Sequence, residues 1–91
     1  MSQKNKEWSV EDDIYVIDQV MLKYKTQDYN LLLKNIASDI GTTQSSVKMR
    51  IQNFMYLLTG EGLEHYAPAS KEAIELSLKK YSKSQLIIAF S

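Results

Sequence analysis

Apolar residues recur every three or four positions along four stretches of the chain, at about 10–24, 29–39, 43–58 and 71–81. This spacing places the apolar side chains of each stretch on one face of a helix. No stretch before the C-terminus alternates apolar and polar residues in the way that a strand does. The pattern therefore predicts an all-α fold.

Residue types that begin and end helices occur at the edges of these stretches. Side chains able to accept a hydrogen bond from the free amides of a first helical turn are Ser9, Asp28, Thr42 or Thr43, and Ser70. Asp12, three residues after Ser9, makes an approximate capping box. Gly41 can adopt the left-handed conformation that ends the second helix before a tight turn into the third.

The apolar stripe of each helix is expected to face a shared core. The stripes comprise Val10, Ile14, Ile17, Val20, Met21 and Tyr24; Leu32, Leu33, Ile36, Ala37 and Ile40; Val47, Ile51, Phe54 and Leu58; and Ala73, Ile74, Leu78 and Tyr81. The expected neighbours of Phe54 are Trp8, Ile17 and Ile36. Three helices joined by short connections, the last two through a glycine-containing turn, match the tri-helical helix-turn-helix pattern. We therefore expect a tri-helical helix-turn-helix core with a fourth C-terminal helix.

The segments outside these helices have different compositions. Residues 1–7 are polar and are expected to form a disordered N-terminus, followed by a single helical domain over 8–91. Between the third and fourth helices, Gly60 and Glu61 indicate a turn, and Leu63 and Tyr66 are expected to hold the following loop on the core. The apolar segment from Leu86 to Phe90 could be a docked helical turn, an edge strand or the contact of a homodimer, because periodicity cannot decide over so few residues.

Composition narrows the functions that the chain can have. Its 91 residues, 44% apolar and 24% charged, have the balance of a globular domain. The chain has no cysteine, which fits a cytoplasmic location, and no apolar run approaches the roughly 18 residues of a membrane span. Eleven Lys and Arg residues balance eleven Asp and Glu residues. This balance does not fit a mimic of DNA, which would be strongly acidic. Any binding to DNA is expected to be modest, because phosphate neutralisation supplies much of the affinity and the chain has no excess of positive charge.

The outer face of the third helix, over 43–58, is polar and mildly basic. Major-groove base edges present patterns of hydrogen-bond donors and acceptors that such a face can match. The candidates for contact with base edges or methyl groups are Gln44, Ser45, Lys48, Met49 and Gln52, and those for contact with phosphate are Thr43, Arg50, Asn53 and Lys71. The alternative is that these residues form the solvated face of an ordinary bundle helix.

The residues that could support catalysis have simpler explanations. His65 is the lone histidine and the chain has no cysteine, so a metal site would lack converging ligands. Ser45 and Ser46 stand at a helix start, where serine usually serves as a cap. Asp12 and Asp13 point apart on a helix and complement the positive end of its dipole. We therefore expect no enzymatic activity, no catalytic residue, no metal and no cofactor.

Two segments carry resemblances to known families. The sequences WSVEDD at 8–13 and TTQSSVKMR at 42–50 resemble the opening and the third helix of Myb/SANT-type domains, although the later tryptophans of that pattern are missing. The closer resemblance, over residues 8–80, is to the N-terminal helical domain that precedes HNH nuclease domains in bacterial restriction endonucleases. It rests on IGTTQSSVKMRIQNF at 40–54, GEGLEH at 60–65 and ASK at 69–71, whereas the aspartate-proline usual after the third helix is replaced by Leu57, Leu58 and Thr59. No nuclease domain follows within these residues.

This resemblance implies a module that binds DNA for a nuclease. We therefore expect a small non-enzymatic DNA-binding protein with duplex DNA as its partner and no membrane partner. The alternative is a protein of a phage or mobile element that binds and inhibits a host nuclease, such as a CRISPR effector, through the same helix face. The first interpretation predicts steep salt dependence and the second predicts little.

Overall fold

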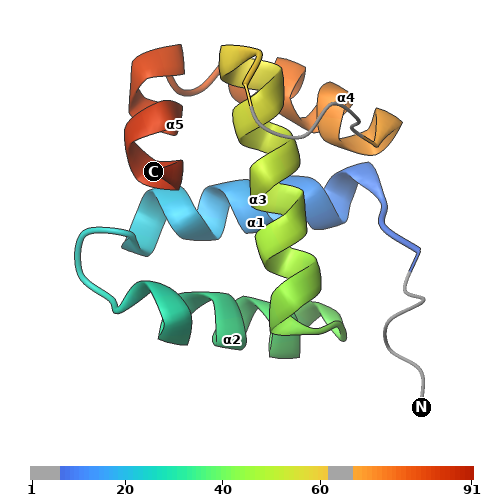
Figure 1. The fold of residues 1–91 in the computed structure, drawn as a ribbon, viewed down its shortest axis with the longest axis vertical. Coiled ribbons are helices and arrows are strands. Elements are labelled where there is room, and N and C mark those ends of the chain that lie inside the picture. The colour runs from blue at the N-terminus through green and yellow to red at the C-terminus, as the bar shows by residue number, and fades with distance from the viewer. Residues whose placement is uncertain (1–6, 62–66) are drawn as a thin grey trace.

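The computed structural model describes residues 7–61 and 67–91, which form helices and no strand (Figure 1). The helices are α1 (Val10–Lys23), α2 (Tyr29–Ile40), α3 (Gln44–Thr59), α4 (Pro68–Ser77) and α5 (Lys83–Phe90). The predicted all-α class is confirmed. The N-terminus predicted to be disordered, apart from Glu7, and the loop residues Leu63, His65 and Tyr66 lie outside the described residues.

The first three helices begin and end within one residue of the bounds that their sequence predicts. The Ser9 hydroxyl accepts a hydrogen bond from the Asp12 amide, and the Asp12 carboxylate accepts one from the Ser9 amide, each at 3.1 Å, which completes the capping box. The Asp28 carboxylate caps α2, and Gly41 ends that helix with a φ of 74°. Only three residues, 41–43, separate α2 from α3. Local signals therefore determine the position of the turn between these helices.

The two threonines in this turn have opposite roles. The Thr43 hydroxyl caps α3 by accepting a hydrogen bond from the Ser46 amide at 3.1 Å. The Thr42 hydroxyl is buried and has no hydrogen-bond partner among the described residues. Thr43 is therefore the cap, and Thr42 fills space in the turn.

This difference predicts opposite effects for the same substitution. Thr43→Val should lower the free energy of unfolding by about 1 kcal/mol, because the helix loses its cap. Thr42→Val should leave the stability unchanged or raise it by up to about 1 kcal/mol, because it removes a polar group that is buried without a partner. Urea unfolding of the two variants checks both expectations. Equal destabilisation by the two substitutions would contradict the assignment of the cap.

The α3 helix crosses in front of α1 and buries one stripe of side chains in the core (Figure 1). The predicted residues Val47, Ile51, Phe54 and Leu58 are all buried. The ring of Phe54 packs against Phe90 of α5, with centroids 5.6 Å apart. The half-buried Trp8 packs against the core, and its ring lies over the Arg50 guanidinium.

The buried face of α1 is rotated from the predicted stripe. Its buried residues are Asp13, Val16, Ile17 and Val20, whereas Val10, Ile14, Met21 and Tyr24 are only partly covered. Both α2 and α4 pack on this helix, so the most deeply buried line runs between the two contacts. This line still has helical spacing, but it includes an aspartate.

The fourth helix begins earlier than predicted. It starts at Pro68, whose fixed φ suits a first helical position, and its N-cap Ala67 makes no side-chain hydrogen bond. Ser70 is therefore not the cap; its side chain is buried and donates a hydrogen bond to Asp13. The helix ends at Ser77 rather than near Tyr81, and Leu78, predicted to face inward, is 43% exposed.

The C-terminal segment forms a fifth helix, which the sequence pattern left open. Ser82 and Gln85 make a capping box that begins α5. Leu86, Ala89 and Phe90 are buried in the core, whereas Ile88 is 62% exposed. Of the three alternatives, the docked helical turn is the one observed, and most of the apolar surface considered for a homodimer is covered by the chain itself.

Candidate nucleic-acid interface

The outer side of α3 presents a continuous polar face. The five residues predicted to contact bases, Gln44, Ser45, Lys48, Met49 and Gln52, are all exposed. They lie on the side of α3 opposite its buried stripe, and none of the other helices lies in front of the N-terminal half of α3 (Figure 1). We call this surface the outer α3 face. The outer α3 face begins directly after the turn at 41–43.

Arg50 does not contribute to this face. Its Nε donates a hydrogen bond to Asp13 Oδ1 at 2.9 Å, and its Nη2 donates to Asp13 Oδ2. The Ser70 hydroxyl donates to the same Oδ2 at 3.2 Å, and the guanidinium lies 4.7 Å from the centre of the Trp8 ring. The side chains of Arg50 and Asp13 are 11% and 0% exposed. Arg50, predicted to contact phosphate, is therefore paired with Asp13 and turned away from the outer α3 face.

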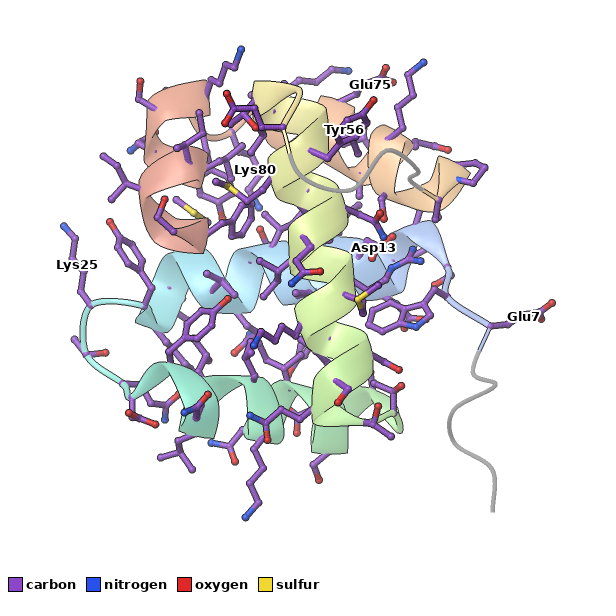
Figure 2. All side chains as sticks on the ribbon, viewed as in Figure 1. Glu7, Asp13, Lys25, Tyr56, Glu75 and Lys80 are labelled. Atoms are coloured by element: carbon purple, nitrogen blue, oxygen red, sulfur yellow. The ribbon has the colours of Figure 1, made fainter. Side chains whose placement is uncertain are left out.

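We call Trp8, Asp13, Arg50 and Ser70 the Arg50 cluster. Figure 2 shows Asp13 beside the middle of α3, on the side from which the N-terminal segment approaches. The cluster joins this segment, α1, α3 and α4, and it neutralises one of the two cations of α3. Lys48 is the cation that remains on the outer α3 face.

The other residues predicted to contact phosphate do not gather on one surface. Thr43 is half-buried and its hydroxyl is engaged in capping α3. Asn53 is half-buried on α3. Lys71 is exposed on α4, where it lines a separate depression with Glu72 and Glu75. These positions provide no concentrated positive charge next to the outer α3 face.

A pocket of about 520 Å³ opens beside the outer α3 face, and we call it the α3 side pocket. Its lining comes from α2, α3, the segment that follows α3, the last residue of α5 and the residue after it: Tyr29, Lys48, Ile51, Gln52, Met55, Glu61, Phe90 and Ser91. Burial raises the pKa of the Tyr29 phenol above its ordinary value. Lys48 and Gln52 belong both to this pocket and to the outer α3 face.

The described residues contain neither a cluster of metal ligands nor a helix that could span a membrane. No three His, Asp or Glu side chains among them lie close enough together to hold a metal ion. None of the helices in the described ranges combines the length and the apolar character needed to cross a bilayer. The lone histidine, His65, falls outside these ranges.

Sequence reasoning missed the Arg50 cluster and the α3 side pocket. Asp13 carried a usable signal, because positions 13, 16, 17 and 20 have the spacing of one helical face on which the other three residues are apolar. An acid in such a line needs a partner when it is buried. The pocket had no such signal, because α5 was not predicted.

Comparison of the chain with known protein families, with characterised proteins and with solved structures gives no match. Function therefore has to be argued from the outer α3 face and its surroundings.

Proposed function

We propose that this protein is a small non-enzymatic DNA-binding module of the helix-turn-helix type, whose outer α3 face enters the major groove. The observation that carries the proposal is the exposure of five consecutive outward positions of α3 directly after a three-residue turn. In helix-turn-helix proteins, the N-terminal residues of the second helix of the motif contact base edges. The resemblance to the module that precedes HNH nuclease domains supports the same assignment.

The side chains on this face suit different parts of the groove. Gln44 and Gln52 carry amides that both donate and accept hydrogen bonds, as adenine recognition requires. Met49, 49% exposed, offers an apolar surface for a thymine methyl group. Lys48 would contact a phosphate or a guanine. Because Asp13 neutralises Arg50, affinity should be modest and should involve few phosphate contacts.

The test is fluorescence anisotropy on mixed-sequence duplexes across a salt series. Lys48→Ala should weaken binding to all sequences and reduce the salt slope by about one unit, because one phosphate contact is lost. Gln52→Ala should instead relax sequence preference, by about 1–3 kcal/mol if the amide contacts a base through two hydrogen bonds. Lys79→Ala, at an exposed position in the turn after α4, is the matched control and should leave binding unchanged. Absence of binding at low salt by folded protein would overturn the proposal.

A second candidate is a protein-binding module that blocks a host nuclease such as a CRISPR effector. The apolar floor of the α3 side pocket, together with a single cation on the neighbouring face, favours a partner other than the phosphate backbone. Such a complex would lose little affinity with added salt. A folded protein that fails to bind duplex DNA at low salt would assign the outer α3 face to this kind of partner.

A further inference from the structure

The α3 side pocket has the size and the walls of a small-molecule site. Its volume of about 520 Å³ lies within the range of roughly 300–1,000 Å³ that is usual for ligand pockets. Ile51 and Phe90, both members of the hydrophobic core, form part of its lining, and the half-buried Met55 and Tyr29 add apolar and aromatic surface. A flat apolar group would therefore find contacts from three helices.

Charge is distributed unevenly along the pocket. Lys48 and Gln52 lie near the N-terminal half of α3, whereas Glu61 follows its C-terminal end. Lys48 and Thr59 are about 16 Å apart along the axis of α3, because each residue of a helix adds about 1.5 Å. Glu61 follows Thr59 by two residues. None of the ion pairs formed among the described residues involves Lys48. The cation Lys48 therefore lies beside Gln52 without an ion-pair partner among the described residues, and the acid Glu61 lies toward the other end of the pocket.

We propose that the α3 side pocket binds a small aromatic acid, with its ring against Ile51, Met55 and Phe90 and its anionic group facing Lys48. The Gln52 amide can donate a second hydrogen bond to the same anion. The Met55 thioether suits a ring, because sulfur makes favourable contacts with aromatic edges.

The position of the site has a consequence for the outer α3 face. A bound acid would occupy Lys48 and Gln52, two of the five residues of that face. It would then compete with duplex DNA. This competition rests on the proposed function, whereas the binding of the acid is independent of it. The two can therefore be tested separately.

The experiment compares two fluorescent probes with the same ring system. Anilinonaphthalene sulfonate carries an anion, and phenylnaphthylamine lacks it. The wild-type protein should bind the sulfonate with a Kd about three to five times lower than that of the neutral probe, as expected for one exposed ion pair. Lys48→Met should abolish this preference, and Gln52→Glu should also abolish it, because the added carboxylate lies one helical turn from Lys48 and neutralises its charge. Both positions are exposed, so these variants should keep the wild-type melting temperature.

Lys34→Met, at an exposed position of α2 outside the pocket lining, is the matched control and should retain the preference. Equal affinity of the wild type for the two probes, or a preference that survives Lys48→Met, would overturn the proposal. In a separate arm, the sulfonate is added to the complex with labelled duplex. Displacement of DNA supports overlap of the sites, and simultaneous binding refutes it. If no duplex binds but Lys48-dependent probe binding persists, the pocket is supported and the proposed DNA-binding function fails.

Discussion

Replacing Arg50 with alanine is expected to lower the free energy of unfolding by about 3–5 kcal/mol, because it leaves a buried carboxylate without its charged partner. The Asp13 side chain has no exposed surface. After the substitution, the Ser70 hydroxyl is the donor that remains of those described for the Asp13 carboxylate. Urea unfolding measures the effect. Lys48→Ala on the same helix is the matched control and should change stability by less than about 0.5 kcal/mol, because Lys48 is exposed.

A double variant separates the loss of the ion pair from the loss of packing. Arg50→Met combined with Asp13→Leu should recover much of the stability lost in Arg50→Met alone, because apolar residues of similar volume can replace a buried ion pair. Trp8 is the only tryptophan and stacks on Arg50, so its emission reports directly on the Arg50 cluster. Stability of Arg50→Ala within about 1 kcal/mol of wild type would show that the ion pair does not hold α3 in place.

This result also determines how DNA binding can be tested. From the sequence, Lys48 and Arg50 are both cations on the flanks of one helix, and replacing both is expected to leave the fold intact. The structure separates them, because Arg50 is paired with Asp13 and Lys48 is exposed. Loss of DNA binding in an Arg50 variant would therefore report on the fold, and only Lys48 variants test the outer α3 face.

The parts of the fold that the sequence predicts correctly are those that depend on near neighbours. Ser9 and Asp12 lie three residues apart and bond to each other's amides, and Gly41 takes a conformation that few other residues accept. The stripe of α3 is long enough for its period to be unambiguous. The exposed residues of the outer α3 face follow from this stripe, because they occupy the opposite side of the same helix.

The parts that could not be predicted depend on distant residues or on competing local signals. Asp13 and Arg50 are 37 residues apart, and a long side chain on the flank of a helix can turn toward the core or toward water. At the start of α4, both Pro68 and Ser70 are residue types that begin helices, so local signals compete. The structure buries Ser70, whose hydroxyl donates a hydrogen bond to the Asp13 carboxylate. The eight residues of α5 are too few for periodicity to distinguish a helix from a strand. The α3 side pocket depends on that helix.

The second large effect is expected at the centre of the core. Phe54→Ala should lower the free energy of unfolding by about 3–5 kcal/mol, because it removes a fully buried ring and leaves a cavity. It also removes the aromatic contact between α3 and α5. Domains of this size are stable by only about 5–15 kcal/mol, so the variant should lose a large fraction of its stability.

Thermal unfolding followed by circular dichroism provides the measurement for Phe54. A loss of 3 kcal/mol corresponds to a fall in Tm of at least about 12 °C for a domain of this length. Phe54→Leu is the matched control, since it keeps most of the apolar volume and should lose roughly half as much stability or less. Phe90→Leu removes the other ring of the pair, so the double variant Phe54→Leu with Phe90→Leu should lose less than the sum of the two single losses if the rings stabilise each other. A Tm for Phe54→Ala within a degree or two of wild type would mean that α3 does not bury this face, and that the outer α3 face has been placed on the wrong side of the helix.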